Sequence, residues 1–464
     1  MSPEEVYNSR AIEFGARAEW LQKLSNRLSL ARLLSFFGGL VLFASIASWT
    51  VRVALIVLSL SMISFIWFVI RYITNEKRRE YNQQLKIINT RELNSLSGNF
   101  TDYYEGHEYI DREHPNSFDL DLFGKASLYQ FICRTTSKPA SDLLAKYLSE
   151  PATINEVLHR QKAISELKPM TSWRQELMVL GYANADKGND PRGILRWLSS
   201  DNIFKKTQPL RFISIVLSMA ALASVILAVT AMPVVVVAPT LTLNFLFHFS
   251  LLRKINRLHE QVSRSSNLLR SYSSTIELIE NTQFNADRLK ALRENFSGQT
   301  PASGRIKRLS RLVNRLDSRL NVLVSVPLNL LFLTDIHFCL ALEKWKVEHA
   351  VSIPVWFSAM AEFEVMSSFA NMAFNNPDWA FPVIVPDYFL FRADNMGHPL
   401  IPSGRRITND IEISGQGKTI IITGSNMSGK STFLRTCGVN TVLALAGSPV
   451  CASSFTLSHV RVHS

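Results

Sequence analysis

The sequence is poor in charged residues and in cysteine. Only 19% of its 464 residues are Asp, Glu, Lys or Arg, whereas an average soluble domain has about 25%. Because 47% of the residues are hydrophobic, intrinsic disorder is excluded, and part of the apolar mass is expected to face something other than a protein core. The four cysteines form no CxxC pair, which argues against a zinc site or a disulfide framework and favours a reducing compartment.

The charges that are present are unbalanced. The chain carries 50 Lys and Arg against 38 Asp and Glu, a net charge of +12. Such a balance favours acidic partners, which include nucleic acid, nucleotides and anionic lipid. The length alone predicts about three domains.

Four long apolar runs form two pairs. Leu33–Trp49 and Val53–Ile70 contain no charged residue, and Phe212–Ala231 and Val234–Leu252 form a second pair in mid-chain. A membrane-spanning helix needs about 20 mostly apolar residues, so each pair predicts a transmembrane hairpin. Polar residues and a proline make the fourth run the weakest candidate. The alternative for both pairs is a set of buried helices in a large soluble core.

Basic residues flank both predicted hairpins on their outer sides, whereas the two turns contain only Arg52. The positive-inside rule therefore predicts that both hairpins enter from the cytoplasm of a multi-pass inner-membrane protein, with all soluble parts cytoplasmic. The flanking basic residues are Arg27, Arg32, Arg71, Lys77, Arg78, Arg79, Lys205, Lys206, Arg211, Arg253, Lys254 and Arg257.

Two further segments of the second half are predicted to be helical. Val322–Leu342 is apolar but contains Asp335, which is costly at a bilayer centre, so it is predicted to be a buried helix of a cytoplasmic domain. Arg305–Leu320 has an apolar seam at helical spacing beside a cationic stripe. The stripe consists of Arg308, Arg311, Arg315 and Arg319.

Residues 253–319 hold most of the excess charge, with 14 Lys and Arg against 6 Asp and Glu. Three interpretations of the stripe remain open: a solvated face, a contact with anionic inner-leaflet lipid, or a contact with nucleic-acid phosphate.

A phosphate-binding motif lies near the C-terminus. Lys418–Thr423 is a β-branched run that predicts a buried strand, Gly424–Ser431 matches GxxxxGK[ST], and Thr432–Leu445 predicts a helix. In such a loop, glycines let backbone N–H groups face the phosphates, and the following helix start adds its positive dipole end. The predicted nucleotide-binding residues are Gly424, Ser425, Asn426, Met427, Ser428, Gly429, Lys430, Ser431 and Thr432.

Within this loop, the Lys430 ammonium is expected to reach the β- and γ-phosphates of ATP, and the Ser431 hydroxyl is expected to ligate Mg²⁺. Thr432 is a candidate for the α-phosphate. ATP and Mg²⁺ are therefore the predicted cofactors.

The segment TGSNMSGKSTFLR closely resembles the phosphate loop of MutS-family mismatch-repair ATPases. The resemblance covers roughly residues 120–200 and 255–464, and several flanking segments share it. They are Ser127–Gln130, Arg134–Thr136, Pro151, Arg160–Leu167, Ala361–Val365, Phe381-Pro382, Gly397–Ile401 and Ala446–Ala452.

Together with the apolar runs, this resemblance predicts a mainly α fold, in which transmembrane hairpins interrupt a MutS-like helical core and lever, followed by the start of an α/β P-loop NTPase domain. The implied organisation is an N-terminal cytoplasmic helix (1–30), a transmembrane hairpin (31–72), a linker (73–121), the first part of the core (122–208), a second hairpin (209–252), the second part of the core and lever (253–392) and a truncated ATPase domain (393–464).

The sequence also departs from the family. The mismatch-reading domain and the DNA-clamp insertion of MutS proteins are not visible, and Arg406 lies near the position of the aromatic residue that stacks on adenine in the family. Residues 452–464 contain no Asp or Glu. The acidic strand end and the signature segment are expected beyond Ser464, so the chain is predicted to be a fragment whose catalytic residues lie outside it.

By resemblance, the function is that of a membrane-anchored ATPase that works as a homodimer and is linked to the binding of mismatched DNA. The alternative is an ATP-driven conformational switch at the membrane that does not bind DNA. A machine that couples ATP to transport through the hairpins is the third hypothesis.

Overall fold

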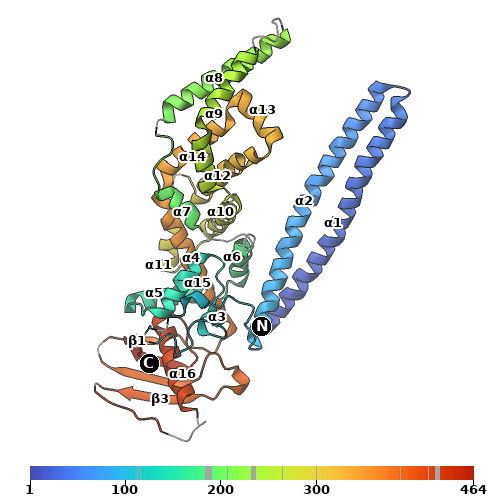
Figure 1. Ribbon diagram of the computed structural model, residues 1–464. Helices are drawn as coiled ribbons and strands as arrows, with labels where there is room; N and C mark the ends of the chain where they lie inside the picture. Colours follow the sequence, from blue (N-terminus) through green and yellow to red (C-terminus); the bar gives the residue numbers. More distant parts are fainter. Residues whose placement is uncertain are drawn as a thin grey trace.

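The computed structural model has three parts (Figure 1). A long hairpin of helices α1 (Pro3–Ala47) and α2 (Val51–Leu96) runs along one side, a helical core fills the middle, and a small sheet with helix α16 (Lys430–Ala446) lies at the end that holds the C-terminus. The structure describes residues 1–111, 113–114, 116–182, 191–205, 207–230, 237–263, 265–298, 300–386, 388–415, 417–423 and 429–463.

Both hairpin helices are far longer than a membrane is thick. They have 45 and 46 residues. At 1.5 Å per residue each is about 68 Å long, whereas the hydrocarbon core of a bilayer is about 30 Å. The segment 73–96 contains neither glycine nor proline, so α2 continues unbroken to Leu96. Within the predicted linker at 73–121, the helix thus occupies the first part, and the loop begins at Ser97.

The apolar halves of α1 and α2 pack closely against each other. A Cβ atom added to Gly39 would lie 1.8 Å from the Ser61 Oγ, so only glycine permits this approach. The polar halves instead pack against the core, where Phe14, Leu85 and Ile88 form a small apolar cluster with residues of α6 (Thr171–Tyr182). The hairpin is thus bound to the core near its base, and its apolar half projects away from the core.

The core is built around one long buried helix, α15 (Ser352–Asn375). Every residue from Ala359 to Ala373 is buried, and most of these residues are apolar or small. The other core helices are α3 (Leu128–Ile132), α4 (Lys138–Ser149), α5 (Ile154–Leu167), α6, α7 (Arg192–Ser199), α10 (Ser266–Glu280), α11 (Asp287–Glu294), α12 (Ala302–Asp317) and α14 (Thr334–His349).

A second apolar part is formed by α8 (Thr207–Thr230), α9 (Val237–Val262) and α13 (Val322–Phe332). Within the described residues, three helices are long and apolar enough to cross a membrane, namely α1, α2 and α8. Helix α9, which covers the described part of the fourth predicted span, is not one of them, because polar side chains interrupt its apolar surface.

The fifth apolar run, Val322–Leu342, is not the single buried helix that its composition predicted. Helices α13 and α14 meet at an 83° bend at Leu333, whose φ of 49° is left-handed. Helix α14 is largely buried, but α13 is exposed along most of its length, and Leu323 is 87% exposed. The bent pair together is a fourth candidate for a broken or re-entrant membrane segment.

A buried polar cluster holds this bend. The Asp335 carboxylate forms an ion pair with Arg319 (Nε–Oδ2 3.3 Å) and lies 3.3 Å from the His248 Nε2. The Asp335 backbone N–H donates to the Asn329 Oδ1 (2.9 Å), and Asn244 Nδ2 donates to a backbone carbonyl of α13 (2.6 Å). Because unpaired polar groups are costly in apolar surroundings, these contacts fix α9, α13 and α14 relative to one another.

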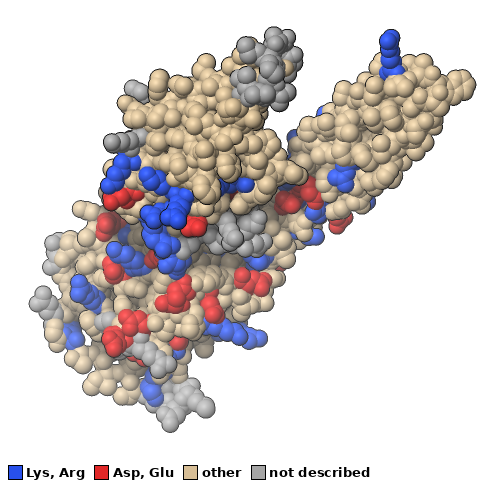
Figure 2. All heavy atoms as spheres, turned by 45° about the horizontal axis from the view of Figure 1, so that its top comes forward, with Lys and Arg blue, Asp and Glu red and all other residues tan. Residues whose placement is uncertain are grey.

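The two apolar parts point the same way. In Figure 1, the apolar end of the hairpin and the α8–α9–α13 part both lie at the end opposite the sheet. On the face shown in Figure 2, both projections are almost without charge apart from a basic residue at the hairpin tip. Lys and Arg gather just below the second projection. Both apolar parts of the molecule therefore lie on the side away from the sheet.

The sheet has the strand order β1-β4-β2-β3. Strand β1 (Val383–Val385) pairs in parallel with β4 (Ser454–Ser458), while β2 (Leu390–Met396) is antiparallel to both β4 and β3 (Asn409–Ser414). The described chain is thus mostly helical with a small mixed sheet.

A buried ion pair fastens the base of the hairpin to the core. Glu92 of α2 and Arg134 lie 2.6 Å apart (Oε1–Nε), with side chains 1% and 3% exposed. Tyr103 Oη donates to the Glu92 Oε1 (2.8 Å), and Asn375 Nδ2 of α15 donates to its Oε2 (2.9 Å). Burial by itself raises the pKa of Glu92, but Arg134 and these hydrogen bonds outweigh it, so the pKa lies below its ordinary value. Tyr7 of α1 completes the junction by donating to the Asn375 Oδ1 (2.7 Å).

We expect Arg134→Met to lower the free energy of unfolding of the full chain by about 3–5 kcal/mol, because it leaves the Glu92 charge buried and unpaired. Chemical denaturation in detergent measures this. Lys146→Ala, which removes an exposed pair with Glu150, is the control and should cost less than about 1 kcal/mol. Since the pKa of Glu92 is lowered, the wild type should also lose stability as the pH falls below the ordinary carboxyl range. If the Arg134→Met variant lost as much stability as the wild type over the same fall in pH, this interpretation of the ion pair would be contradicted.

Candidate nucleotide site

Helix α16 begins where the phosphate-loop motif ends. Gly429 is its N-cap, with a φ of 81° that other residues rarely adopt. Lys430, Ser431 and Thr432 therefore occupy the first turn, at the end where the helix dipole is positive. The helix predicted at Thr432–Leu445 is confirmed, beginning two residues earlier. The other predicted loop residues, Gly424, Ser425, Asn426, Met427 and Ser428, lie outside the described residues.

The segment before the loop is not the buried strand that was predicted. Residues 418–423 pair with no strand among the described residues, and Ile421 is 80% exposed. A β-branched run forms a strand only where neighbouring strands supply hydrogen bonds and burial. The described sheet supplies no neighbour for this segment.

Asn440 of helix α16 joins two of the segments that resemble the MutS family, namely 397–401 and 446–452. This fully buried side chain donates from Nδ2 to the Gly397 carbonyl (3.0 Å) and accepts from the Cys451 N–H at Oδ1 (2.8 Å). Gly397 N–H also donates to the Cys451 carbonyl (2.8 Å). Segments 397–401 and 446–452, far apart in the sequence, are therefore neighbours on one side of α16.

The end of α16 is fastened to the core in the same way. Gly447, with a φ of 86°, ends the helix, and the Arg160 Nη1 of α5 donates to the Ala446 carbonyl (3.2 Å). The Ala152 N–H donates to the Leu445 carbonyl (3.1 Å). The helix that follows the phosphate loop is thus bound to the first part of the core.

Two further segments that resemble the MutS family, 134–136 and 361–365, meet at Glu364 of α15. Its Oε2 accepts from the Thr136 N–H (2.6 Å), the Thr136 Oγ1 (3.0 Å) and the Ser137 N–H (3.0 Å). Burial raises the pKa of Glu364, although these donors favour the carboxylate. Segments 134–136 and 361–365 therefore form one buried joint at the start of α4.

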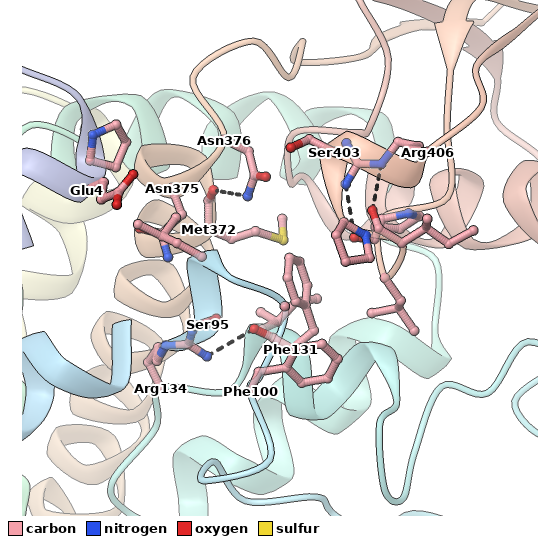
Figure 3. A pocket seen from close by; sticks show the side chains of 18 of the residues that line it. Glu4, Ser95, Phe100, Phe131, Arg134, Met372, Asn375, Asn376, Ser403 and Arg406 are labelled. Atoms are coloured by element: carbon pink, nitrogen blue, oxygen red, sulfur yellow. Dashed lines mark hydrogen bonds between the residues drawn. The ribbon is translucent and has the colours of Figure 1, made fainter. Parts of the chain in front are cut away.

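A cavity of about 280 Å³ lies where the hairpin base, the core and loop 399–406 meet (Figure 3). In Figure 3, Phe100 and Phe131 lie between Arg134 on one side and Arg406 on the other. Arg406 Nε donates to the His398 carbonyl (3.1 Å) and the Ile401 carbonyl (2.9 Å). Arg406 thus stabilises the loop 398–406 through these hydrogen bonds. This is a structural role, unlike that of the aromatic residue that stacks on adenine in the MutS family.

Comparisons with known proteins found relatives that match part of this chain. Residues 420–463 match the family model described as MutS domain V. The chain is 37% identical over 103 residues to a DNA mismatch repair protein MutS of Ehrlichia ruminantium (strain Gardel), covering 22% of this chain and 13% of that protein. It is 35% identical over 112 residues to the MutS of Granulibacter bethesdensis, covering 23% and 12%.

An Endonuclease MutS2 of Bacillus velezensis is also similar, with 42% identity over 66 residues, which cover 14% of this chain and 8% of that protein. The matched regions thus span about an eighth or less of the MutS-type relatives. They support a MutS-family relationship for the part of the chain that they cover.

The structure uses the four arginines of the cationic stripe in two ways. Arg308, Arg311 and Arg315 are exposed on α12, beside an apolar seam that is buried as predicted from Leu309 to Leu316. Arg319 instead pairs with Asp335 and donates to the Asn256 Oδ1 (2.8 Å). The predicted stripe of four is therefore a stripe of three, because the fourth arginine neutralises a buried acid.

Sequence reasoning missed the residues that join these segments. Asn440 lies within the predicted helix, but its spacing carries no sign that it reaches Gly397 and Cys451. Glu92 and Arg134 lie 42 positions apart, on a helix and a loop, so no periodicity connects them. Only the packing of the chain brings such pairs together.

We expect Asn440→Leu to destabilise the chain by about 1–3 kcal/mol, since the buried Gly397 carbonyl and Cys451 N–H both lose their partner. Hydrogen exchange of the Cys451 amide, read by mass spectrometry of peptides, should speed up in the same variant. Asn314→Leu on the exposed face of α12 is the matched control and should change neither quantity. Unchanged exchange at Cys451 in Asn440→Leu would show that the joint does not depend on this side chain.

Proposed function

We propose that this chain belongs to a membrane-anchored MutS-type ATP-binding protein, which is an ATPase in its full-length form and works as a homodimer. The observation that carries the proposal is the start of α16 at Lys430, after a positive-φ Gly429, inside the segment that matches MutS domain V. The relatives' names link the proposed function to DNA mismatch repair.

In this proposal, ATP lies with its phosphates at the loop Gly424–Thr432. The first turn of α16 fits an anion, because it contains no acidic residue and presents its N-terminal dipole end. Lys430 would contact the β- and γ-phosphates, and the exposed Ser431 hydroxyl would ligate Mg²⁺. Bound Mg²⁺ would offset phosphate charge, while the residues of this chain hold and orient the nucleotide.

Membrane anchoring through α1, α2 and α8 is the second part of the proposal. Support comes from the boundary of the hairpin's apolar half, where Arg32 stacks over the Tyr72 ring (5.0 Å) and Arg71 over the Trp67 ring (5.3 Å). Aromatic and basic residues of this kind prefer the level of lipid headgroups. The proposed orientation has the core and the nucleotide segment on the cytoplasmic side of an inner membrane.

Lys430→Ala tests the nucleotide site in the full chain. We expect about 10–100-fold weaker binding of Mg-ATP, since a charge-assisted contact with phosphate is worth about 1.5–3 kcal/mol. Equilibrium dialysis with labelled ATP measures the affinity. Lys418→Ala removes an exposed lysine outside the motif and should leave the affinity unchanged. Equal affinities for wild type and Lys430→Ala would refute the proposed site.

DNA binding is tested by its dependence on salt. If Arg311 and Arg315 contact DNA phosphates, the double variant Arg311→Gln/Arg315→Gln should lower the log–log slope of affinity against salt by about 2. Filter binding with mismatched and matched duplexes measures this, and Lys146→Gln on the distant α4 is the control. Absence of DNA binding by the wild type at low salt would leave the alternative, an ATP-driven switch at the membrane that does not bind DNA.

A further inference from the structure

A cavity of about 630 Å³ lies at the base of α8. Its walls come from the segment just before α8, the first turns of α8, α12 and α14. The cavity therefore sits between the core and the second apolar projection, in the region where Figure 2 shows Lys and Arg gathered below the uncharged part.

Four basic side chains line this cavity, and they come from four different segments. Lys205 precedes α8, Arg211 lies in its first turns, Arg308 lies on α12 and Lys344 lies on α14. All four residues are exposed. Such convergence of cations from separate elements is the arrangement that binds phosphate groups.

Two acidic residues, Glu343 and Glu348, also line the cavity. The Glu343 carboxylate is buried and accepts from the Ile203 N–H (2.9 Å), and Glu348 lies 3.7 Å from the Lys344 ammonium. Four cations against two carboxylates leave the cavity with an excess of positive charge.

The surroundings of the cavity favour a phosphate that is attached to an acyl chain over a free phosphate. Arg211 is followed directly by Phe212, which is 70% exposed and begins the apolar stretch of α8. Val347, also largely exposed, lines the cavity itself. A ligand with a phosphate at one end and an acyl chain at the other matches both surroundings, whereas a free phosphate matches only the first.

We propose that this cavity, which we name the α8 headgroup site, binds the phosphate of an anionic phospholipid headgroup from the cytoplasmic leaflet. The proposal rests on the proposed membrane anchoring. Lys205, Arg211, Arg308 and Lys344 contact the headgroup phosphate, and the acyl chains lie along the exposed apolar face of α8.

The test uses the full chain reconstituted in phosphatidylcholine nanodiscs that contain either no phosphatidylglycerol or a graded fraction of it. Native mass spectrometry after mild release counts the phosphatidylglycerol retained per chain and gives its apparent affinity. Arg211→Gln and Arg308→Gln are the variants, and Arg311→Gln, which removes an exposed cation of the same helix outside the cavity, is the matched control. A separate arm adds inorganic phosphate as a soluble competitor.

We expect each cavity variant to bind phosphatidylglycerol about fivefold more weakly, corresponding to about 1 kcal/mol per basic residue, while Arg311→Gln binds like the wild type. An equal loss in Arg311→Gln would overturn the site in favour of diffuse surface attraction. Displacement of the lipid by inorganic phosphate at a similar concentration would overturn it in favour of a soluble phosphate ligand.

Flotation of the wild type with pure phosphatidylcholine vesicles, resistant to alkaline washing, separates this proposal from the anchoring on which it rests. Failure to float would overturn both. Flotation without selective retention of phosphatidylglycerol would overturn the α8 headgroup site and leave the anchoring intact.

Discussion

The buried ion pair between Glu92 and Arg134 is the contact on which the arrangement of the molecule depends. A hairpin about 68 Å long has a large lever arm, so its direction is set by the few contacts at its base. The pair is costly to bury, but Tyr103 and Asn375 supply the hydrogen bonds that make it stable. Because Asn375 belongs to α15, the same network fastens the hairpin to the central helix of the core.

Helix α15 connects the parts that the proposed function requires. Its C-terminal end contacts the hairpin base through Asn375, its middle binds the residues just before α4 through Glu364, and the chain then continues into β1 and β2. Helix α16 reaches the same core from the other side through Arg160. The segment that follows the phosphate loop and the base of the hairpin therefore lie on one continuous packed body.

Contacts between polar groups also determine how the helices of the second apolar part, α8, α9 and α13, are arranged. Asp335 lies in an apolar run, where it forms an ion pair with Arg319 and lies within hydrogen-bond distance of His248, and this pairing goes together with the bend between α13 and α14. Arg319 is thereby removed from the cationic face of α12, and α13 is left exposed beside α8 and α9. Exposed basic residues, Arg308 among them, line the cavity at the start of α8.

The sequence by itself determined the elements whose signals are local. The apolar runs of α1, α2 and α8, the apolar seam of α12 and the helix after Gly429 all follow from residues close together in the chain, and the motif at Gly424–Ser431 pointed to the relatives that the comparisons identify. Tertiary structure alone decided which polar residues are paired. The bend at Leu333 and the joints at Asn440 and Glu92 depend on partners distant in the sequence, and residues 418–423 are exposed because the described sheet supplies no neighbouring strand. Burial and hydrogen bonding are properties of the packed chain, so no local pattern specifies them.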